Sequence, residues 1–229
     1  MTKTGKLVVV GDSAIAEIAY EFFTHDSPYD VVAFAVDEAY LTRESLFGLP
    51  VVPFQRVEQR FAPAEHSLFV AIGYNQLNRL RARFAREGKA KGYRLASYVS
   101  SRAFVWRNVE LGEHCFIFEH NVVQPFVKIG NNVVLWSGNH VGHHSVIRDN
   151  VFVASHVVIS GFCDVGESCF LGVNATIANN VTVGRDCLIG AGAMILRDTE
   201  AGRIYGAKGT AAHETKTARA HFKVPEEAS

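Results

Sequence analysis

Aliphatic residues recur at every sixth position along nearly half of the chain. Val, Leu or Ile occupies sixteen consecutive positions of this kind, from Val105 to Ile195. The positions two residues earlier, from Ala103 to Ala193, carry small or medium side chains. Alternate residues of a strand point to the same side, so we expect both columns to face inward. A fixed short period predicts a solenoid, in which each coil buries its apolar residues against its neighbours.

Glycine follows the aliphatic position in seven of these repeats, at Gly112, Gly130, Gly142, Gly166, Gly172, Gly184 and Gly190. A recurrent glycine indicates a corner that needs either a positive φ or a close approach of the backbone. One short strand and one corner in every six residues predict a triangular prism. Each coil of this prism then contains three strands and eighteen residues.

The first hundred residues follow a different pattern. Three apolar runs predict buried strands: Lys6–Val10, Val31–Val36 and His66–Ile72. The stretch Ala14–Thr24 predicts an amphipathic helix, and a second helix that includes Leu77 is expected with Asn75 as its N-cap. Arg94–Val99 is expected to be a last strand. Alternating strands and helices predict a small parallel sheet, and we divide the chain at residues 1–98, 99–200 and 201–229.

Ligands of such a sheet bind beyond the carboxyl ends of its strands, and phosphates favour the helix that follows the first strand. The turn at Gly11, Asp12 and Ser13 lacks the full glycine pattern of a dinucleotide site, and the segment is too short for a full dinucleotide fold. We therefore predict a mononucleotide site. The alternative is a helper domain that binds no ligand.

The balance of charges, the lengths of the apolar runs and the positions of the cysteines limit the partners and the compartment that we expect. The chain has 23 basic and 23 acidic residues, which gives no electrostatic reason to expect nucleic acid or an anionic membrane as partner. No apolar run approaches the ~18 residues of a spanning helix, and the first ten residues lack the features of a signal peptide, so a cytoplasmic protein is expected. The four cysteines all fall in the small inward column, where we interpret them as buried hydrophobes.

The prism pattern resembles that of the hexapeptide acyltransferases, which implies a left-handed parallel β-helix. Joined to a small, Rossmann-like α/β domain, it makes the whole chain similar to the bacterial nucleotide-amino-sugar N-acetyltransferases, which are grouped with sialic acid O-acetyltransferases. The resemblance implies acetyl-CoA or another short acyl-CoA as co-substrate, a nucleotide-linked amino sugar as acceptor, a homotrimer, and a role in surface polysaccharide or lipopolysaccharide synthesis. Sugar O-acetylation remains an alternative, as does a non-catalytic, nucleotide-sugar-binding or scaffolding trimer.

The same resemblance assigns site residues. The nucleotide-sugar candidates are Gly11, Asp12, Ser13, Asp37, Gly73, Asn75 and Arg79. The coenzyme A candidates are Gly161, Asn179, Gly190, Ala191, Gly206 and Lys208, the last two in a loop after the prism. Residues 211–229 are polar and are expected to be partly disordered.

Histidines supply the candidate base. Six of the ten lie in the prism, most densely in residues 136–147, and an imidazole with a pKa near 6.5 suits proton removal from an attacking amine. The resemblance implies His143 as base, and the N–H of Gly161, eighteen residues further on, as oxyanion donor.

The sequence departs from the family beside this base. The family usually has acidic residues on both sides of the histidine, whereas this chain has Gly142 and His144. Asp149, Glu119 or a neighbouring subunit is a possible substitute for the missing carboxylate. His144 is a second candidate, as base or orienting partner. A zinc site is not expected, because no histidine pair of the prism has the spacing of the prism-shaped carbonic anhydrases.

Overall fold

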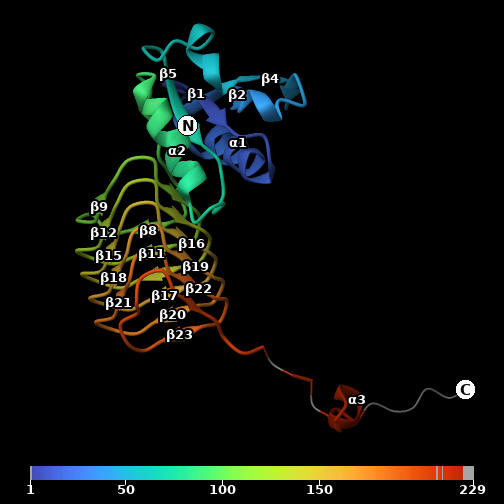
Figure 1. Ribbon diagram of the computed structural model, residues 1–229, viewed down its shortest axis with the longest axis vertical. Coiled ribbons are helices and arrows are strands. Elements are labelled where there is room, and N and C mark those ends of the chain that lie inside the picture. Colours follow the sequence, from blue (N-terminus) through green and yellow to red (C-terminus); the bar gives the residue numbers. More distant parts are fainter. Residues whose placement is uncertain (1, 210, 213, 224–229) are drawn as a thin grey trace, which may run out of the picture.

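The computed structural model describes residues 2–209, 211–212 and 214–223. An α/β unit at the amino terminus lies against the first coils of a long prism of short strands (Figure 1). The tail leaves the far end of the prism and carries a short helix, α3 (Ala218–His221). The disorder expected for residues 211–229 stays a prediction, and residues 213 and 224–229 of this range lie outside the described part. No helix of the described residues has the length and apolar character needed to cross a membrane.

The amino-terminal sheet has the strand order β3-β4-β2-β1-β5-β6. Its strands are β1 (Gly5–Val10), β2 (Tyr29–Val36), β3 (Ser45–Leu46), β4 (Leu49–Pro53), β5 (His66–Val70) and β6 (Arg94–Leu95). All neighbours pair in parallel except the β3–β4 hairpin. Helix α1 (Ala14–Asp26) packs on one side of the sheet and α2 (Arg79–Ala90) on the other. Two short 3-10 helices, η1 (Glu38–Tyr40) and η2 (Phe54–Gln59), follow β2 and β4. The predicted Rossmann-like α/β unit is confirmed.

The second helix begins later than the sequence predicts. Asn75 is not its N-cap, because Asn78 holds that position and Leu77 lies outside the helix. Residues 76–78 have φ values of 55°, 48° and 66°, a left-handed turn that costs about 1–2 kcal/mol per residue. The amide of Asn78 donates to the carbonyl of Cys169 in the prism (3.2 Å). A tertiary contact therefore overrides the local capping signal.

Two further elements differ from the prediction. The β3–β4 hairpin, close to the turn residue Gly48 (φ 75°), was not expected. The strand expected at Arg94–Val99 is divided, because β6 completes the first sheet and β7 (Tyr98–Val99) opens the prism. The chain thus passes from one unit to the other within four residues.

The prism has three sheets, called here faces I, II and III. Face I contains β7, β10 (Phe116–Ile117), β13 (Val134–Leu135), β16 (Phe152–Val153), β19 (Phe170–Leu171), β22 (Leu188–Ile189) and β24 (Ile204–Tyr205). Face II contains β8 (Phe104–Val105), β11 (Val122–Val123), β14 (His140–Val141), β17 (Val158–Ile159), β20 (Thr176–Ile177) and β23 (Met194–Ile195). Face III contains β9 (Glu110–Leu111), β12 (Lys128–Ile129), β15 (Val146–Ile147), β18 (Asp164–Val165) and β21 (Thr182–Val183).

The prism is the left-handed parallel β-helix that the resemblance to the hexapeptide acyltransferases implies. Neighbouring strands on a face pair in parallel, and most lie eighteen residues apart, as Phe116 does from Val134. Most of both inward columns are buried in one core, including all four cysteines, which are free thiols. Burial raises the pKa of the Cys115 and Cys169 thiols to about 12, so they act as apolar packing groups.

The recurrent glycines serve close packing rather than a positive φ. A Cβ on Gly142 would lie 2.5 Å from the carbonyl carbon of Ser160 and 2.6 Å from the nitrogen of Gly161 in the next coil. The left-handed residue of each corner comes two positions later, as at His144 (φ 60°) and Asn150 (φ 62°). Of the two alternatives for these glycines, the structure supports the close approach.

The first strands of face I, from β7 to β19, are covered by the amino-terminal unit. Phe69 packs against Phe116 with ring centroids 4.9 Å apart, and Phe22 stacks on Tyr98 at 5.2 Å. The guanidinium of Arg81, only 1% exposed, donates to the prism residue Asn132 at its side-chain oxygen (2.9 Å) and its carbonyl (3.0 Å). Burial lowers the pKa of Arg81 to about 9. Aromatic packing and buried hydrogen bonds therefore join the two units.

Candidate functional site

The first part of the site is the carboxyl edge of the amino-terminal sheet. Gly11, Asp37 and Gly73 follow β1, β2 and β5, which are neighbours in the sheet. Gly11 has a φ of 118°, and a Cβ there would lie 2.8 Å from the carbonyl oxygen of Ala71. Ser13 is the N-cap of α1, and its side chain makes no capping hydrogen bond. The structure therefore brings most of the predicted nucleotide residues to one edge.

Two arginines that the sequence did not single out also lie at this edge. Arg43 forms an ion pair with Asp12 (Nε to Oδ2, 3.4 Å), and Arg83 pairs with Asp37 (Nη2 to Oδ2, 3.6 Å). Asp37 also accepts hydrogen bonds from the backbone of Ala39 (3.2 Å) and the amide of Gln55 (3.0 Å). The position of Arg83 on the predicted second helix could have identified it as a site residue from the sequence. Nothing in the sequence identified Arg43, which lies in a loop before the β3–β4 hairpin.

Arg79 does not join this group. Its guanidinium donates to Asp186 at a prism corner, with Nη2 and Oδ1 2.6 Å apart. Asn75 lies in the exposed segment that follows Gly73. The strained turn before α2 directs Arg79 towards the prism, so its charge stabilises the contact between the two units.

The second part of the site is the prism corner between faces II and III. His143 and His144 lie exposed between β14 and β15. The His143 ring lies over Gly161, since a Cβ on that glycine would be 2.9 Å from Cε1 and 3.0 Å from Nε2 of the ring. The backbone N–H of His143 donates to the side-chain oxygen of Gln124 (3.0 Å). The predicted stacking of His143 on Gly161 is confirmed.

The carboxylates suggested as partners of His143 are engaged elsewhere. Glu119 accepts a hydrogen bond from the Ser137 hydroxyl (2.6 Å), and Asp149 accepts one from the backbone N–H of Asn131 (2.8 Å). Among the described residues no acidic side chain forms an ion pair with His143 or His144. Instead, the Nδ1 atoms of these two histidines lie 3.1 Å apart. Neither Glu119 nor Asp149 therefore forms a hydrogen bond or ion pair with His143 within the same chain.

The expected oxyanion donor already has an acceptor. The N–H of Gly161 donates to Oδ1 of Asn179, one coil further on, at 2.9 Å. Asn179 is itself exposed, so its side chain has room to move. A thioester carbonyl can accept a hydrogen bond from Gly161 when this side chain turns away.

The coenzyme A candidates fall on two corners of the prism. Gly161 and Asn179 lie between faces II and III, whereas Gly190 and Ala191 follow β22 at the corner between faces I and II. A Cβ on Gly190 would lie 3.2 Å from Cα of Gly206, and Lys208 is exposed two residues beyond it. One chain alone therefore does not place all of these residues along a single edge.

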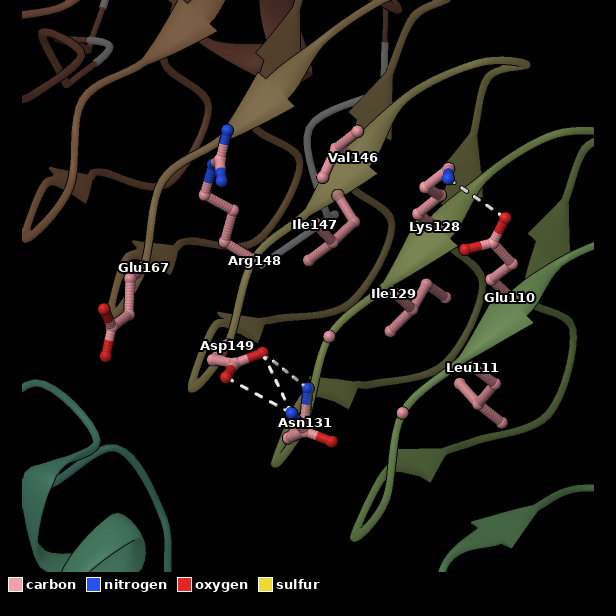
Figure 2. Close-up of a pocket in the computed structure, with 12 residues that line it drawn as sticks. Glu110, Leu111, Lys128, Ile129, Asn131, Val146, Ile147, Arg148, Asp149 and Glu167 are labelled. Atoms are coloured by element: carbon pink, nitrogen blue, oxygen red, sulfur yellow. Dashed lines mark hydrogen bonds and ion pairs between the residues drawn. The ribbon is translucent and has the colours of Figure 1, made fainter.

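Two hollows lie near these elements. A groove of about 510 Å³ begins at Ala14 of α1 and runs between that helix and the prism, past Glu17, Trp136 and Glu119. A shallow pocket of about 570 Å³ covers face III (Figure 2). Lys128 and Glu110 in this pocket form an ion pair at 3.0 Å, and Asp149 is the one residue considered for the site that lines it. The groove beside α1 connects the sheet edge with the prism and is the better candidate for a substrate path.

Comparisons with known proteins agree with this architecture. The bacterial transferase hexapeptide (six repeats) model matches residues 126–161 and 162–197. No protein of curated function matches the sequence. The acetyltransferase domain of PglB from Neisseria gonorrhoeae FA1090 has a TM-score of 0.81 and 25% identity, over 89% of this chain and 97% of that one; this domain has also been solved with acetyl coenzyme A.

A second solved structure is PerB from Caulobacter crescentus, in complex with CoA and GDP-perosamine. It has a TM-score of 0.76 and 25% identity, over 90% of this chain and 96% of that one. A variant of this perosamine N-acetyltransferase with one histidine replaced by asparagine, also bound to CoA and GDP-perosamine, has a TM-score of 0.69 and 25% identity, over 92% and 100% of the two chains. The chain is thus a hexapeptide-repeat protein with the two-domain fold of bacterial sugar acetyltransferases.

Proposed function

We propose that this protein is an acyl-CoA-dependent N-acyltransferase that transfers an acetyl group to the amine of a nucleotide-linked amino sugar. The observation that carries the proposal is the presence, in one chain, of an exposed histidine over a backbone glycine and of a nucleotide-type sheet edge. Structures of the same two-domain fold hold CoA together with GDP-perosamine. Such a product serves surface polysaccharide or lipopolysaccharide synthesis. The cytoplasm is the proposed compartment, because four buried free thiols suit a reducing environment.

His143 is the proposed base. The sugar amine attacks the thioester carbonyl carbon, and Nε2 of His143 accepts the proton that the nitrogen loses. The N–H of Gly161 donates to the developing oxyanion after the Asn179 side chain has moved. The C–S bond then breaks, and the departing CoA thiolate takes the proton from His143. The histidine thereby returns to its starting state.

The amino-terminal unit is proposed to hold the nucleotide diphosphate. The first N–H groups of α1, those of Ala14 and Ile15, precede the first hydrogen bond of the helix and attract a phosphate, and Gly11 lets the backbone approach closely. Arg43 and Arg83 are exposed cations at this edge. Arg43 now pairs with Asp12, and Arg83 pairs with Asp37 and Glu87. The groove beside α1, with Glu17 and Glu119 in its wall, suits an amino sugar that carries a cationic group.

The catalytic site is proposed to lie between the subunits of a homotrimer. Gly161 and Gly190 occupy different corners of one prism, and two prisms packed through face II bring such corners together. Face II also carries the exposed apolar residues Phe104 (53%), Val158 (39%) and Met194 (67%). Exposed apolar residues on one face are typical of a contact between subunits.

Transfer assays test the proposal. The purified chain is incubated with acetyl-CoA and with UDP-, GDP- or dTDP-linked amino sugars, and released thiol and acetylated sugar are measured. We expect transfer to at least one amino sugar, and His143→Asn should lower kcat by about 10²–10⁴ with little change in either KM. Asp37→Ala should raise KM for the nucleotide sugar only, because Asp37 lies on the other unit.

Three results would contradict the proposal in different ways. Transfer to a sugar hydroxyl but to none of the amines would indicate an O-acetyltransferase. Binding of both ligands without transfer would indicate a scaffold. Full activity of His143→Asn would show that the amine loses its proton without this base.

A further inference from the structure

His143 and His144 form a pair at the corner between faces II and III, and the proposed reaction assigns no role to His144. Their Nδ1 atoms are 3.1 Å apart and their ring planes stand at 88° to one another. This is a hydrogen-bond distance between two ring nitrogens. One nitrogen must then carry a proton and donate it, while the other accepts through its lone pair.

His144 is held in place by its own neighbours. Its ring is stacked between Phe126, with centroids 4.6 Å apart and planes at 27°, and Phe162, at 4.8 Å and 17°. The three residues occupy the same corner position in successive coils, and all have a positive φ. These two stacking contacts hold the plane of the His144 ring. Within that plane its Nδ1 faces Nδ1 of His143, and this contact would be lost if the ring flipped.

The direction of the hydrogen bond decides whether His143 can act as a base. A neutral imidazole carries its proton on only one nitrogen. The Cε1–Nε2 edge of His143 is the part of the ring that lies over Gly161. If the proton resides on Nδ1, then Nε2 faces the reaction with a free lone pair; if it resides on Nε2, that nitrogen can accept nothing.

We infer that His144 is a positioning residue: its Nδ1 accepts a hydrogen bond from Nδ1–H of His143 and so keeps Nε2 of His143 unprotonated. The inference rests on the proposed function. His144 carries its own proton on Nε2 and neither gains nor loses one during the reaction. When Nε2 of His143 accepts the amine proton, the resulting imidazolium keeps its Nδ1–H bond to neutral His144. A second imidazole thereby performs the orienting task, and no carboxylate is needed.

The chain itself offers matched substitutions. Phenylalanine already occupies this corner position at Phe126 (φ 65°) and Phe162 (φ 59°), so His144→Phe preserves the backbone and the stack while it removes the nitrogen. Asparagine occupies the equivalent position at Asn150 (φ 62°) and Asn180 (φ 61°). His144→Asn therefore also fits the backbone, and it restores an oxygen that can accept from Nδ1–H.

The first measurement is kinetic. We expect His144→Phe to lower kcat about 10–10³-fold, with both KM values within about twofold of wild type and an unchanged melting temperature. His144→Asn should recover most of this loss. Phe126→Leu, which leaves the nitrogen in place, should cost less than His144→Phe. Wild-type kcat in His144→Phe, or an equal loss in His144→Asn, would overturn the inference.

The second measurement does not depend on activity. In the full chain labelled with ¹⁵N-histidine, long-range ¹H–¹⁵N spectra report which ring nitrogen carries the proton. We expect His143 to be protonated on Nδ1 in the wild type and to shift towards Nε2 in His144→Phe. The same tautomer in both proteins would overturn the inference. A tautomer shift in a protein that transfers no acetyl group would instead support the positioning role and refute the proposed function.

Discussion

At the residue scale, the absence of a side chain at Gly161 leaves room for the ring of His143, the proposed base. The three atoms nearest to a Cβ there would belong to the imidazole of His143, with Cε1 at 2.9 Å, and that ring is exposed and able to move. Gly142 lies in the preceding coil, directly before His143 in the sequence. A Cβ on Gly142 would instead lie 2.5 Å from the backbone carbonyl carbon of Ser160. Two glycines at adjacent corner positions of neighbouring coils thus have different tasks.

Substitution of these two glycines separates the tasks. Gly161→Ala should lower kcat at least tenfold, because it displaces the base, while the melting temperature stays within a few degrees of wild type. Gly142→Ala should lower the melting temperature markedly, because the next coil cannot yield without distortion. Thermal unfolding and kinetics of both variants provide the check. A strong loss of stability in Gly161→Ala would show that the added Cβ clashes with rigid backbone and not with the movable ring of His143.

At the element scale, the end of β5 is held by a histidine of the prism. The N–H of Val70 donates to Nε2 of His114 (2.8 Å), whose Nδ1 lies 2.7 Å from Oδ1 of Asn132. Nε2 can accept only while it is unprotonated. Burial lowers the pKa of His114 to about 3, so the ring stays neutral in the folded protein over the ordinary pH range.

This buried ring links the stability of the fold to pH. The unfolded chain binds a proton at His114 near pH 6.5, whereas the folded chain does so only near pH 3. The contribution of His114 is therefore complete above pH 6.5. It falls by roughly 1.4 kcal/mol per pH unit as the pH drops towards 3.

Urea unfolding at pH 7.5 and pH 5 measures this effect. We expect the free energy of unfolding to decrease more in the wild type than in His114→Gln, which cannot titrate. Equal decreases in the two proteins would mean that His114 is protonated in the fold.

At the scale of the whole molecule, the three faces of the prism have different surroundings. Face I is covered by the amino-terminal unit over its first strands, from β7 to β19 (Figure 1). Face III carries ion pairs such as that of Arg148 with Asp164 (Nη2 to Oδ2, 2.6 Å). Face II carries exposed apolar side chains. Burial of face II would therefore stabilise an assembly of several chains more than burial of either other face.

Sedimentation tests the assembly. We expect three chains of 25.2 kDa to form a particle of about 76 kDa. Val158→Glu, at the middle of face II, should yield monomers and lose activity with the shared site. Thr182→Glu, an equivalent change on an exposed strand position of face III, should leave the trimer intact. A wild-type monomer at micromolar concentration would refute both the assembly and the shared site.

The sequence by itself determined the prism, its inward columns, the Rossmann-like unit and the place of His143 over Gly161. These features follow from periods of six and eighteen residues, because each coil contacts only its neighbours and local alternation sets which side chains face inward. Only the tertiary structure decided that Arg79 pairs with Asp186 and that Asn179 accepts from Gly161. It also decided that His143 is paired with an imidazole. Such contacts depend on how separate elements pack and on the rotamers of individual side chains. Neither leaves a periodic pattern in the sequence from which it could be predicted.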